Sequence, residues 1–130
     1  MWFFKKQTSL VGSGILEGFT DYHSHILPGV DDGASDWEET NEMLRRAYEQ
    51  GITHIIATPH YVSGQDTHSL REMVKKLRET AFSISENMMV DLGQEVQYFE
   101  ELPSFLEQGK VLTLSGKGNS CKLSACTLTV

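Results

Sequence analysis

Short apolar runs alternate with segments of helical periodicity across most of this 130-residue chain. The apolar runs predict four strands, at residues 19–27, 52–58, 88–92 and 111–114. The segments between them place apolar side chains three or four residues apart and predict helices at residues 37–50, 69–85 and 101–108. A repeated strand-then-helix order is typical of a parallel sheet with right-handed crossovers, either open or part of a barrel. The sequence therefore predicts an α/β fold.

The ends of the first predicted helix carry the clearest local signals. Ser35 or Asp36 is expected to be the N-cap, because its side chain can accept a hydrogen bond from a free N–H of the first turn. Gly51 stands where the residue after a helix often needs a left-handed backbone. These signals place the helix immediately before the second apolar run.

The composition favours one globular domain, with 39% apolar and 22% charged residues. The net charge of −7 argues against a nucleic-acid partner or an anionic membrane surface, which need clustered Lys and Arg. It is compatible with a phosphate substrate, because bound metal ions supply positive charge locally. No apolar run reaches the roughly 18 residues of a transmembrane helix. The first residues do not fit a signal peptide, so we expect a cytoplasmic protein without membrane insertion.

The two ends of the chain lack this patterning. Residues 1–18 are interpreted as an N-terminal extension, residues 19–114 as the domain, and residues 115–130 as an atypical tail. Cys121 and Cys126 lie in the tail, and neither a second cysteine pair nor histidines follow to complete a zinc site. We interpret them as reduced thiols without a function.

Two histidines in the first predicted strand are separated by a single residue. Alternate strand positions share a face, so Asp21, His23 and His25 are expected to point the same way. Such neighbours are about 6–7 Å apart at Cα, close enough for two imidazoles to bind one ion. The alternative interpretation of this segment alone is a polar strand face exposed to solvent.

Two further candidates follow the next two strands. His60 comes just after the second predicted strand, and Glu95 just after the third. Because the carboxyl ends of parallel strands meet at one edge, these side chains and His25 are expected on a shared rim. Asp31 and Asp32 lie in the loop after the first strand and can reach the same rim. A single histidine after a strand is more often a surface residue, but three such placements favour a metal site.

The chemistry of this set points to hydrolysis. Mixed imidazole and carboxylate ligands suit zinc, manganese or iron, whereas magnesium and calcium prefer oxygen alone. A carboxylate such as Glu95 can bridge two ions. Such a cluster promotes phosphoester hydrolysis by lowering the pKa of a bound water and by clamping the phosphoryl oxygens. The sequence therefore predicts a metal-dependent phosphoesterase.

Three segments resemble the polymerase-and-histidinol-phosphatase (PHP) superfamily: Asp21 to Gly33, Gly51 to His60 and Gly93 to Glu95. The closer resemblance is to its bacterial tyrosine-protein phosphatases of capsular and exopolysaccharide synthesis. It implies a distorted (β/α)7 barrel, of which this chain would be the N-terminal part, and a polynuclear cluster that usually holds manganese. It also implies phosphotyrosine on a bacterial tyrosine kinase as the substrate.

The resemblance also implies a role for individual residues. His23, His25 and Glu95 would hold the first metal ion, and Glu95 would bridge to a second. Asp32 and His60 would belong to a third. Asp32 and Glu95 would then carry the catalytic roles.

The later segments of that superfamily do not follow. After Leu114 the chain lacks the expected aromatic-Val/Leu-Leu/Ile-Glu, His-x-x-Arg and Asp-x-His segments. We therefore expect about the first half of a barrel, ended by a truncation or a shifted reading frame, with an incomplete metal cluster. An open half-barrel leaves strand edges unpaired, so we expect low stability, aggregation and almost no activity. A cooperative thermal melt in the mesophile range would contradict this expectation.

Three functions stay open on the sequence. The first is the protein-tyrosine phosphatase or a fragment of it, which the segment from Ile26 to Gly33 favours. The second is another phosphoesterase of the superfamily, such as a histidinol phosphatase or a polymerase-associated nuclease. The third is a metal-binding remnant or interaction module without activity.

Overall fold

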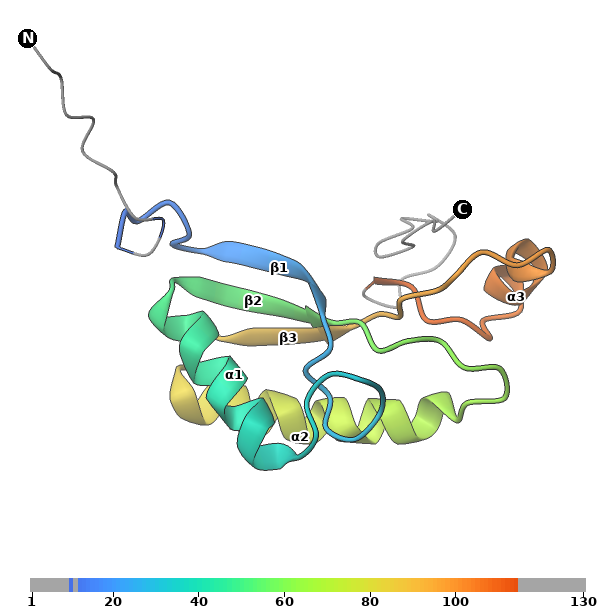
Figure 1. Cartoon of the computed structure of the whole chain (residues 1–130), viewed down its shortest axis with the longest axis horizontal. Helices are drawn as coiled ribbons and strands as arrows, with labels where there is room; N and C mark the ends of the chain where they lie inside the picture. The colour runs from blue at the N-terminus through green and yellow to red at the C-terminus, as the bar shows by residue number, and fades with distance from the viewer. Residues whose placement is uncertain (1–9, 11, 115–130) are drawn as a thin grey trace, which may run out of the picture.

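This computed structural model describes Leu10 and residues 12–114. Strands and helices alternate along the chain (Figure 1). They are β1 (Phe19–Ser24), α1 (Trp37–Glu49), β2 (Ile52–Ala57), α2 (Thr67–Ile84), β3 (Met89–Leu92) and α3 (Leu102–Glu107). This order confirms the predicted alternation as far as the third helix.

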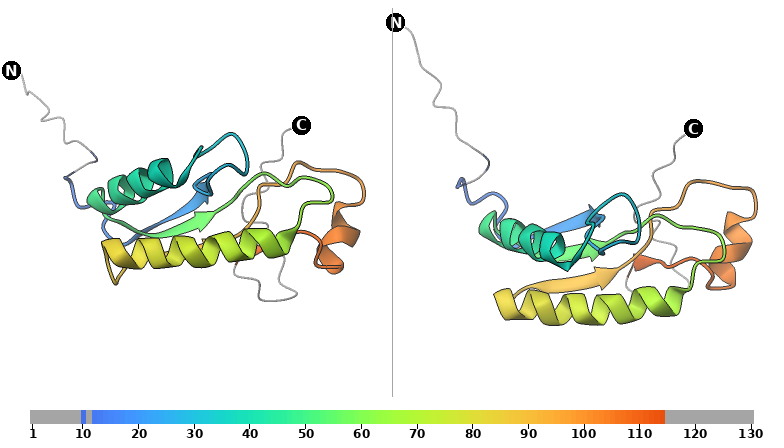
Figure 2. Two further views of the ribbon diagram at one scale, coloured as in Figure 1. Left: turned by 90° about the horizontal axis from the view of Figure 1, so that it is seen from below. Right: turned by 60° about the horizontal axis from the view of Figure 1, so that its bottom comes forward.

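The three strands form one parallel sheet in the order β1-β2-β3. Both long helices, α1 and α2, lie on the same face of this sheet (Figure 2). Ile55 of β2 and Val90 of β3 are register partners, and both are buried in the core that these helices cover. The arrangement confirms the predicted α/β fold class.

The helices begin and end where side chains satisfy free backbone groups. The Asp36 side chain accepts the Glu39 N–H at 2.9 Å, which confirms the predicted cap of α1. Gly51 follows α1 with a φ of +95°, a backbone conformation that favours glycine. Asp66 accepts two N–H groups of the next turn, so α2 begins at Thr67, two residues before the predicted start.

The main core lies between the sheet and the two long helices. Its buried residues are Ile26, Leu27, Leu44, Ile55, Ala57, Leu70, Val74, Leu77, Ala81, Met88, Val90, Leu92 and Leu112. A smaller cluster lies around α3 and consists of Val96, Leu102 and Val111 with partly buried aromatic residues. The core holds the strands in place, so the loops at their carboxyl ends start from a rigid base.

The first strand is shorter than predicted. It ends at Ser24 instead of Leu27, because the chain turns there into a loop. The Ala34 N–H donates to the His25 carbonyl at 3.0 Å and closes that loop. His25 therefore lies just beyond the strand.

The predicted fourth strand is wrong. Residues 111–114 contain no strand. The Leu112 N–H donates to the side-chain oxygen of the buried Gln94 at 2.8 Å, so a neighbouring strand cannot use it. Val111 instead packs in the small cluster around α3.

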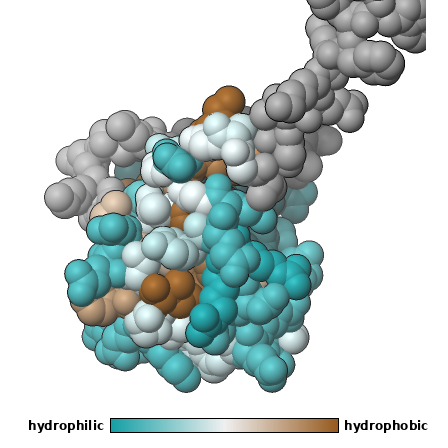
Figure 3. Space-filling view, turned by 90° about the vertical axis from the view of Figure 1, so that its left-hand side faces the viewer, coloured by the Kyte–Doolittle hydropathy of each residue, from teal (hydrophilic) through white to brown (hydrophobic). Residues whose placement is uncertain are grey.

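The predicted tail at residues 115–130, with Cys121 and Cys126, lies outside the described residues, as do residues 1–9 and 11. Within the part that the structure describes, none of the helices combines the length and the apolar character needed to cross a membrane. Seen from the side at which the strands begin, the described surface is mainly hydrophilic, with small separate hydrophobic groups (Figure 3).

Candidate metal centre

Consecutive strand ends carry histidine and glutamate side chains. His23 lies near the end of β1 and His25 just after it, while His60 follows β2 and Glu95 follows β3. Backbone pairing continues past the last two strands. His60 and Glu95 form an isolated parallel bridge, in which the Tyr61 N–H donates to the Glu95 carbonyl at 2.7 Å. The extended sheet therefore fixes the positions of these two residues relative to each other.

One carboxylate oxygen of Glu95 lies among three imidazoles. Its Oε2 is 2.9 Å from His25 Nε2, 3.4 Å from His23 Nε2 and 3.4 Å from His60 Nδ1. His25 Nε2 and His23 Nε2 are 3.1 Å apart. Two nitrogens that bind one ion at about 2.0–2.1 Å lie roughly 3.0–3.5 Å from each other. The observed separations therefore fit ligands of a shared ion.

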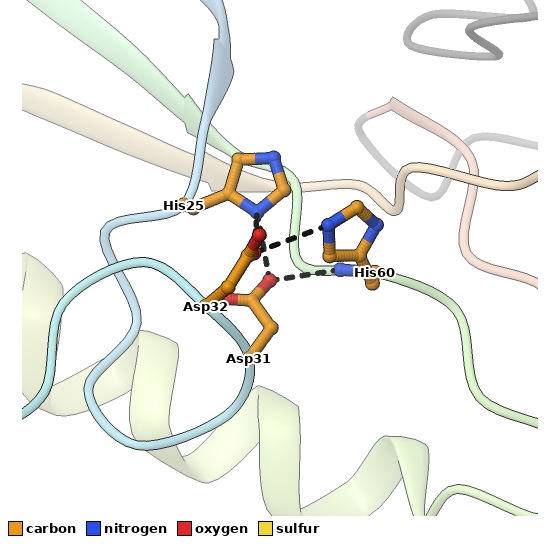
Figure 4. A group of neighbouring side chains, drawn as sticks. All are labelled: His25, Asp31, Asp32 and His60. Carbon is orange, nitrogen blue, oxygen red and sulfur yellow. Dashed lines mark hydrogen bonds and ion pairs between the residues drawn. The ribbon is translucent and has the colours of Figure 1, made fainter.

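The loop between His25 and Ala34 brings two aspartates to the other edge of the His25 ring (Figure 4). Asp32 is exposed, and its Oδ1 lies 3.2 Å from His60 Nε2. Asp31 is partly buried, accepts the His60 N–H at 3.0 Å and lies 2.8 Å from His25 Nδ1. The two aspartates thus extend the cluster from His25 toward His60.

Gly33 allows this loop to fold back against His25. A Cβ at position 33 would lie 2.0 Å from the His25 carbonyl oxygen and 2.4 Å from the His25 Cβ. The Gly33 N–H also donates to Asp31 Oδ1 at 3.0 Å. A larger residue at this position would therefore push the two aspartates away from the histidines.

The surroundings of Asp31 favour its charged form. Burial by itself raises the pKa of this carboxyl. The N–H groups of His60 and Gly33 and the imidazole of His25 outweigh burial and hold the pKa below its usual value of 3.8. Asp31 is therefore ionised near neutral pH and can only accept hydrogen bonds.

These side chains form two groups that share His25. In each group, one nitrogen or oxygen atom per residue lies within 4.8 Å of the others. Imidazole together with carboxylate is a donor set for zinc, manganese or iron. The residues fit a metal site, and we call the combined set the candidate metal centre: His23, His25, Asp31, Asp32, His60 and Glu95.

Residues 19–120 match the protein family described as capsular polysaccharide synthesis, CpsB/CapC. The chain belongs to the CpsB/CapC family. This finding confirms the resemblance that the histidine-containing motifs indicated.

Several relatives of this chain carry the name tyrosine-protein phosphatase, YwqE and CpsB among them. YwqE of Bacillus subtilis is 37% identical over 98 residues, which cover 73% of this chain and 39% of the relative. CpsB of Streptococcus pneumoniae is 31% identical over 98 residues, which cover 73% of this chain and 40% of the relative. The chain thus spans about two fifths of the length of these relatives.

A solved structure supports the same relationship. One chain from the crystal structures of YwqE and CpsB, described as metal-dependent tyrosine phosphatases, matches with a TM-score of 0.68 and 36% identity. The match covers 75% of this chain and 41% of that chain. It confirms the predicted PHP-type α/β fold for the matched part.

The structure brings the five predicted ligands together, at His23, His25, Asp32, His60 and Glu95. Asp31 also belongs to the candidate metal centre, although the sequence only placed it within reach of the rim. Its place beside Asp32, in a loop bounded by Gly29 and Gly33, was the available signal. Asp21, which the strand pattern placed on the same face as His23 and His25, is not among these residues; its side chain accepts the His23 N–H at 3.1 Å.

Proposed function

We propose that this chain forms the metal-binding part of a tyrosine-protein phosphatase of capsular polysaccharide synthesis. The observation that carries the proposal is the position of Glu95 Oε2, within 3.4 Å of nitrogens from three histidines. Membership of the CpsB/CapC family and the similarity to metal-dependent tyrosine phosphatases support it.

The candidate metal centre would hold up to three ions. His23, His25 and Glu95 would bind the first ion, and Glu95 would also face a second. Asp32 and His60 would bind a further ion, since their side chains contact each other at 3.2 Å and both are solvent-accessible. Bound ions supply positive charge for the phosphoryl oxygens and activate water for attack on phosphorus.

The chain's own residues have complementary tasks in this proposal. Glu95 gathers the three histidines, and the exposed Asp32 is free to bind an ion or to direct a water molecule. Because the whole chain carries a net charge of −7, bound cations are needed to attract a phosphorylated substrate.

The substrate we propose is phosphotyrosine on a bacterial tyrosine kinase of the polysaccharide machinery, in the cytoplasm. Manganese is the proposed metal, with zinc or iron as alternatives, because the mixed nitrogen and oxygen donors suit all three. Metal analysis of the chain purified without chelators would test this choice. A tightly bound zinc ion that manganese cannot replace would contradict it.

The activity can be tested on this chain and on a chimera in which the rest of YwqE follows the matched segment. We expect the chimera with Mn²⁺ to hydrolyse a phosphotyrosine peptide much faster than histidinol phosphate. His60→Gln should lower kcat/KM by more than the roughly 10- to 100-fold typical of residues outside the ligand shell. His54→Gln is the matched control, because His54 lies in β2, the strand that leads to His60, but outside the candidate metal centre.

Preference for histidinol phosphate would overturn the proposed substrate in favour of another phosphoesterase. Equal activity of the His54→Gln and His60→Gln chimeras would overturn the proposed site. A second candidate function is metal binding without turnover, which needs only the histidine and carboxylate groups that this chain brings together. Bound manganese on this chain, with no hydrolysis above that of buffer, would support it.

A further inference from the structure

The two adjacent aspartates of the candidate metal centre differ in exposure and in their contacts. The Asp32 side chain is 80% exposed, whereas that of Asp31 is 7% exposed. Asp31 Oδ2 accepts the His60 N–H at 3.0 Å and contacts His25 Nδ1 at 2.8 Å, and its Oδ1 accepts the Gly33 N–H at 3.0 Å. A carboxylate has about four lone-pair positions, so protein donors occupy most of those of Asp31.

The contact to His25 determines which ring nitrogen carries the proton. An ionised carboxylate only accepts hydrogen bonds, so His25 Nδ1 must donate to Asp31. In a neutral imidazole, Nε2 then keeps its lone pair. This nitrogen lies 2.9 Å from Glu95 Oε2 and 3.1 Å from His23 Nε2. Several electron-rich atoms that face each other at these distances attract a cation.

We propose that Asp31 is a positioning residue and not a metal ligand: it holds the Nδ1–H of His25, so that Nε2 faces the ion. The inference rests on the proposed function as a metal-dependent enzyme. Carboxylates behind metal-binding histidines orient the ring and raise its basicity. The same carboxylate accepts the main-chain N–H of His60, so it also ties the end of β1 to the end of β2.

Titration of the metal-free full chain with Co²⁺, followed by visible absorption, tests this role. We expect Asp31→Asn to weaken Co²⁺ binding by about 10- to 100-fold, with the same number of ions bound at saturation. Asp91→Asn is the matched control. Asp91 lies 3.0 Å from a histidine nitrogen on the same sheet but outside the candidate metal centre, so its loss should leave Co²⁺ affinity unchanged.

A double-mutant cycle separates positioning from direct ligation. If Asp31 acts through the His25 ring, Asp31→Asn should change Co²⁺ affinity by less than about twofold in a His25→Ala background. A direct ligand would lower the affinity again in that background. Asp31→Ser serves as a second variant if circular dichroism shows that Asp31→Asn unfolds the chain, because a serine hydroxyl can still accept the Gly33 N–H.

The possible outcomes test the positioning role of Asp31 separately from the candidate metal centre. Unchanged Co²⁺ affinity in the Asp31 variants, or an equal loss with and without His25, overturns the positioning role and leaves the proposed function standing. Absence of Co²⁺ binding by the unmodified chain overturns the candidate metal centre itself, and the role of Asp31 with it.

Discussion

Two clusters of histidine and carboxylate side chains join neighbouring strands of this sheet, and their surroundings differ. The candidate metal centre lies at the carboxyl ends of the strands, whereas the second cluster lies farther back along them. In the second cluster, His54 Nε2 is 3.0 Å from Asp91 Oδ2, and His54 Nδ1 is 3.4 Å from Thr20 Oγ1. Arg78 of α2 donates to the other oxygen of Asp91 at 3.2 Å. Every polar atom of that histidine and carboxylate therefore has a protein partner.

The negative charges of the candidate metal centre have different partners. Among the residues that the structure describes, no Lys or Arg forms an ion pair with Asp31, Asp32 or Glu95. Three imidazoles converge on one carboxylate oxygen instead, and an imidazole is a cation only when protonated. In the second cluster, Arg78 completes a structural cross-link. In the candidate metal centre, no such cation is present among the described residues, so the nitrogen and oxygen atoms are available to bind a metal ion.

The largest contrast between the clusters should appear on adding metal. At 100 times its dissociation constant, Mn²⁺ should stabilise the chain by about 2.7 kcal/mol, and EDTA should remove this gain. Glu95→Gln should abolish the gain, because Glu95 contacts all three histidines. Thermal melts followed by circular dichroism, with and without Mn²⁺, measure it. Asp91→Asn is the control and should keep the full stabilisation by Mn²⁺. If both variants lost this stabilisation, the two clusters would not differ in metal binding.

The next effect concerns the loop between His25 and Ala34, which contributes Asp31 and Asp32 to the candidate metal centre. Gly33→Ala should cost about 1–3 kcal/mol, because the new methyl group overlaps the His25 backbone, and it should also weaken Mn²⁺ binding. Urea unfolding and Mn²⁺ titration measure the two effects. Gly64→Ala is the control: Gly64 has a φ of +78° and open space around it, so about 1 kcal/mol of backbone strain is expected without a change in metal affinity. Equal losses for both glycines would show that the loop does not depend on the close approach.

Much of the candidate metal centre follows from order along the chain. His60 and Glu95 come after apolar runs, and the rule that parallel strands present their carboxyl ends at one edge is enough to bring them together. His25 could be placed in the same way, although it lies beyond β1 and not within it. The alternation of strands and helices was predicted from the apolar runs and from the helical spacing of apolar residues between them.

The remainder depends on contacts that no local pattern encodes. The part that Asp31 plays follows from the loop folding back at Gly33, which only the packed structure shows. The predicted strand at residues 111–114 failed because a side-chain oxygen of Gln94 captures a backbone N–H. The cross-link between His54 and Asp91 joins residues 37 positions apart.

A smaller effect is expected when the second cluster is broken. Arg78→Met should lower the free energy of unfolding by about 1–2 kcal/mol, because it removes the partly exposed contact to Asp91 and the hydrogen bond from Arg78 Nε to the Val90 carbonyl. Stabilisation by Mn²⁺ should stay as in the unmodified chain. Urea unfolding at fixed Mn²⁺ concentrations measures both quantities. A weakened response to Mn²⁺ would show that the two clusters are coupled through the sheet.

The smallest expected effect is the pH dependence that Asp31 gives to the metal-free chain. Its pKa is lower in the folded chain than the usual 3.8, so the charged form stabilises the fold above that pH. The contribution is lost as the pH falls through the folded pKa, where the carboxyl takes up a proton. The difference in Tm between the unmodified chain and Asp31→Asn should therefore be largest near neutral pH and shrink below 3.8. Thermal melts in EDTA between neutral and strongly acidic pH measure it. A difference that stays constant over this range would mean that Asp31 contributes through packing and not through its charge.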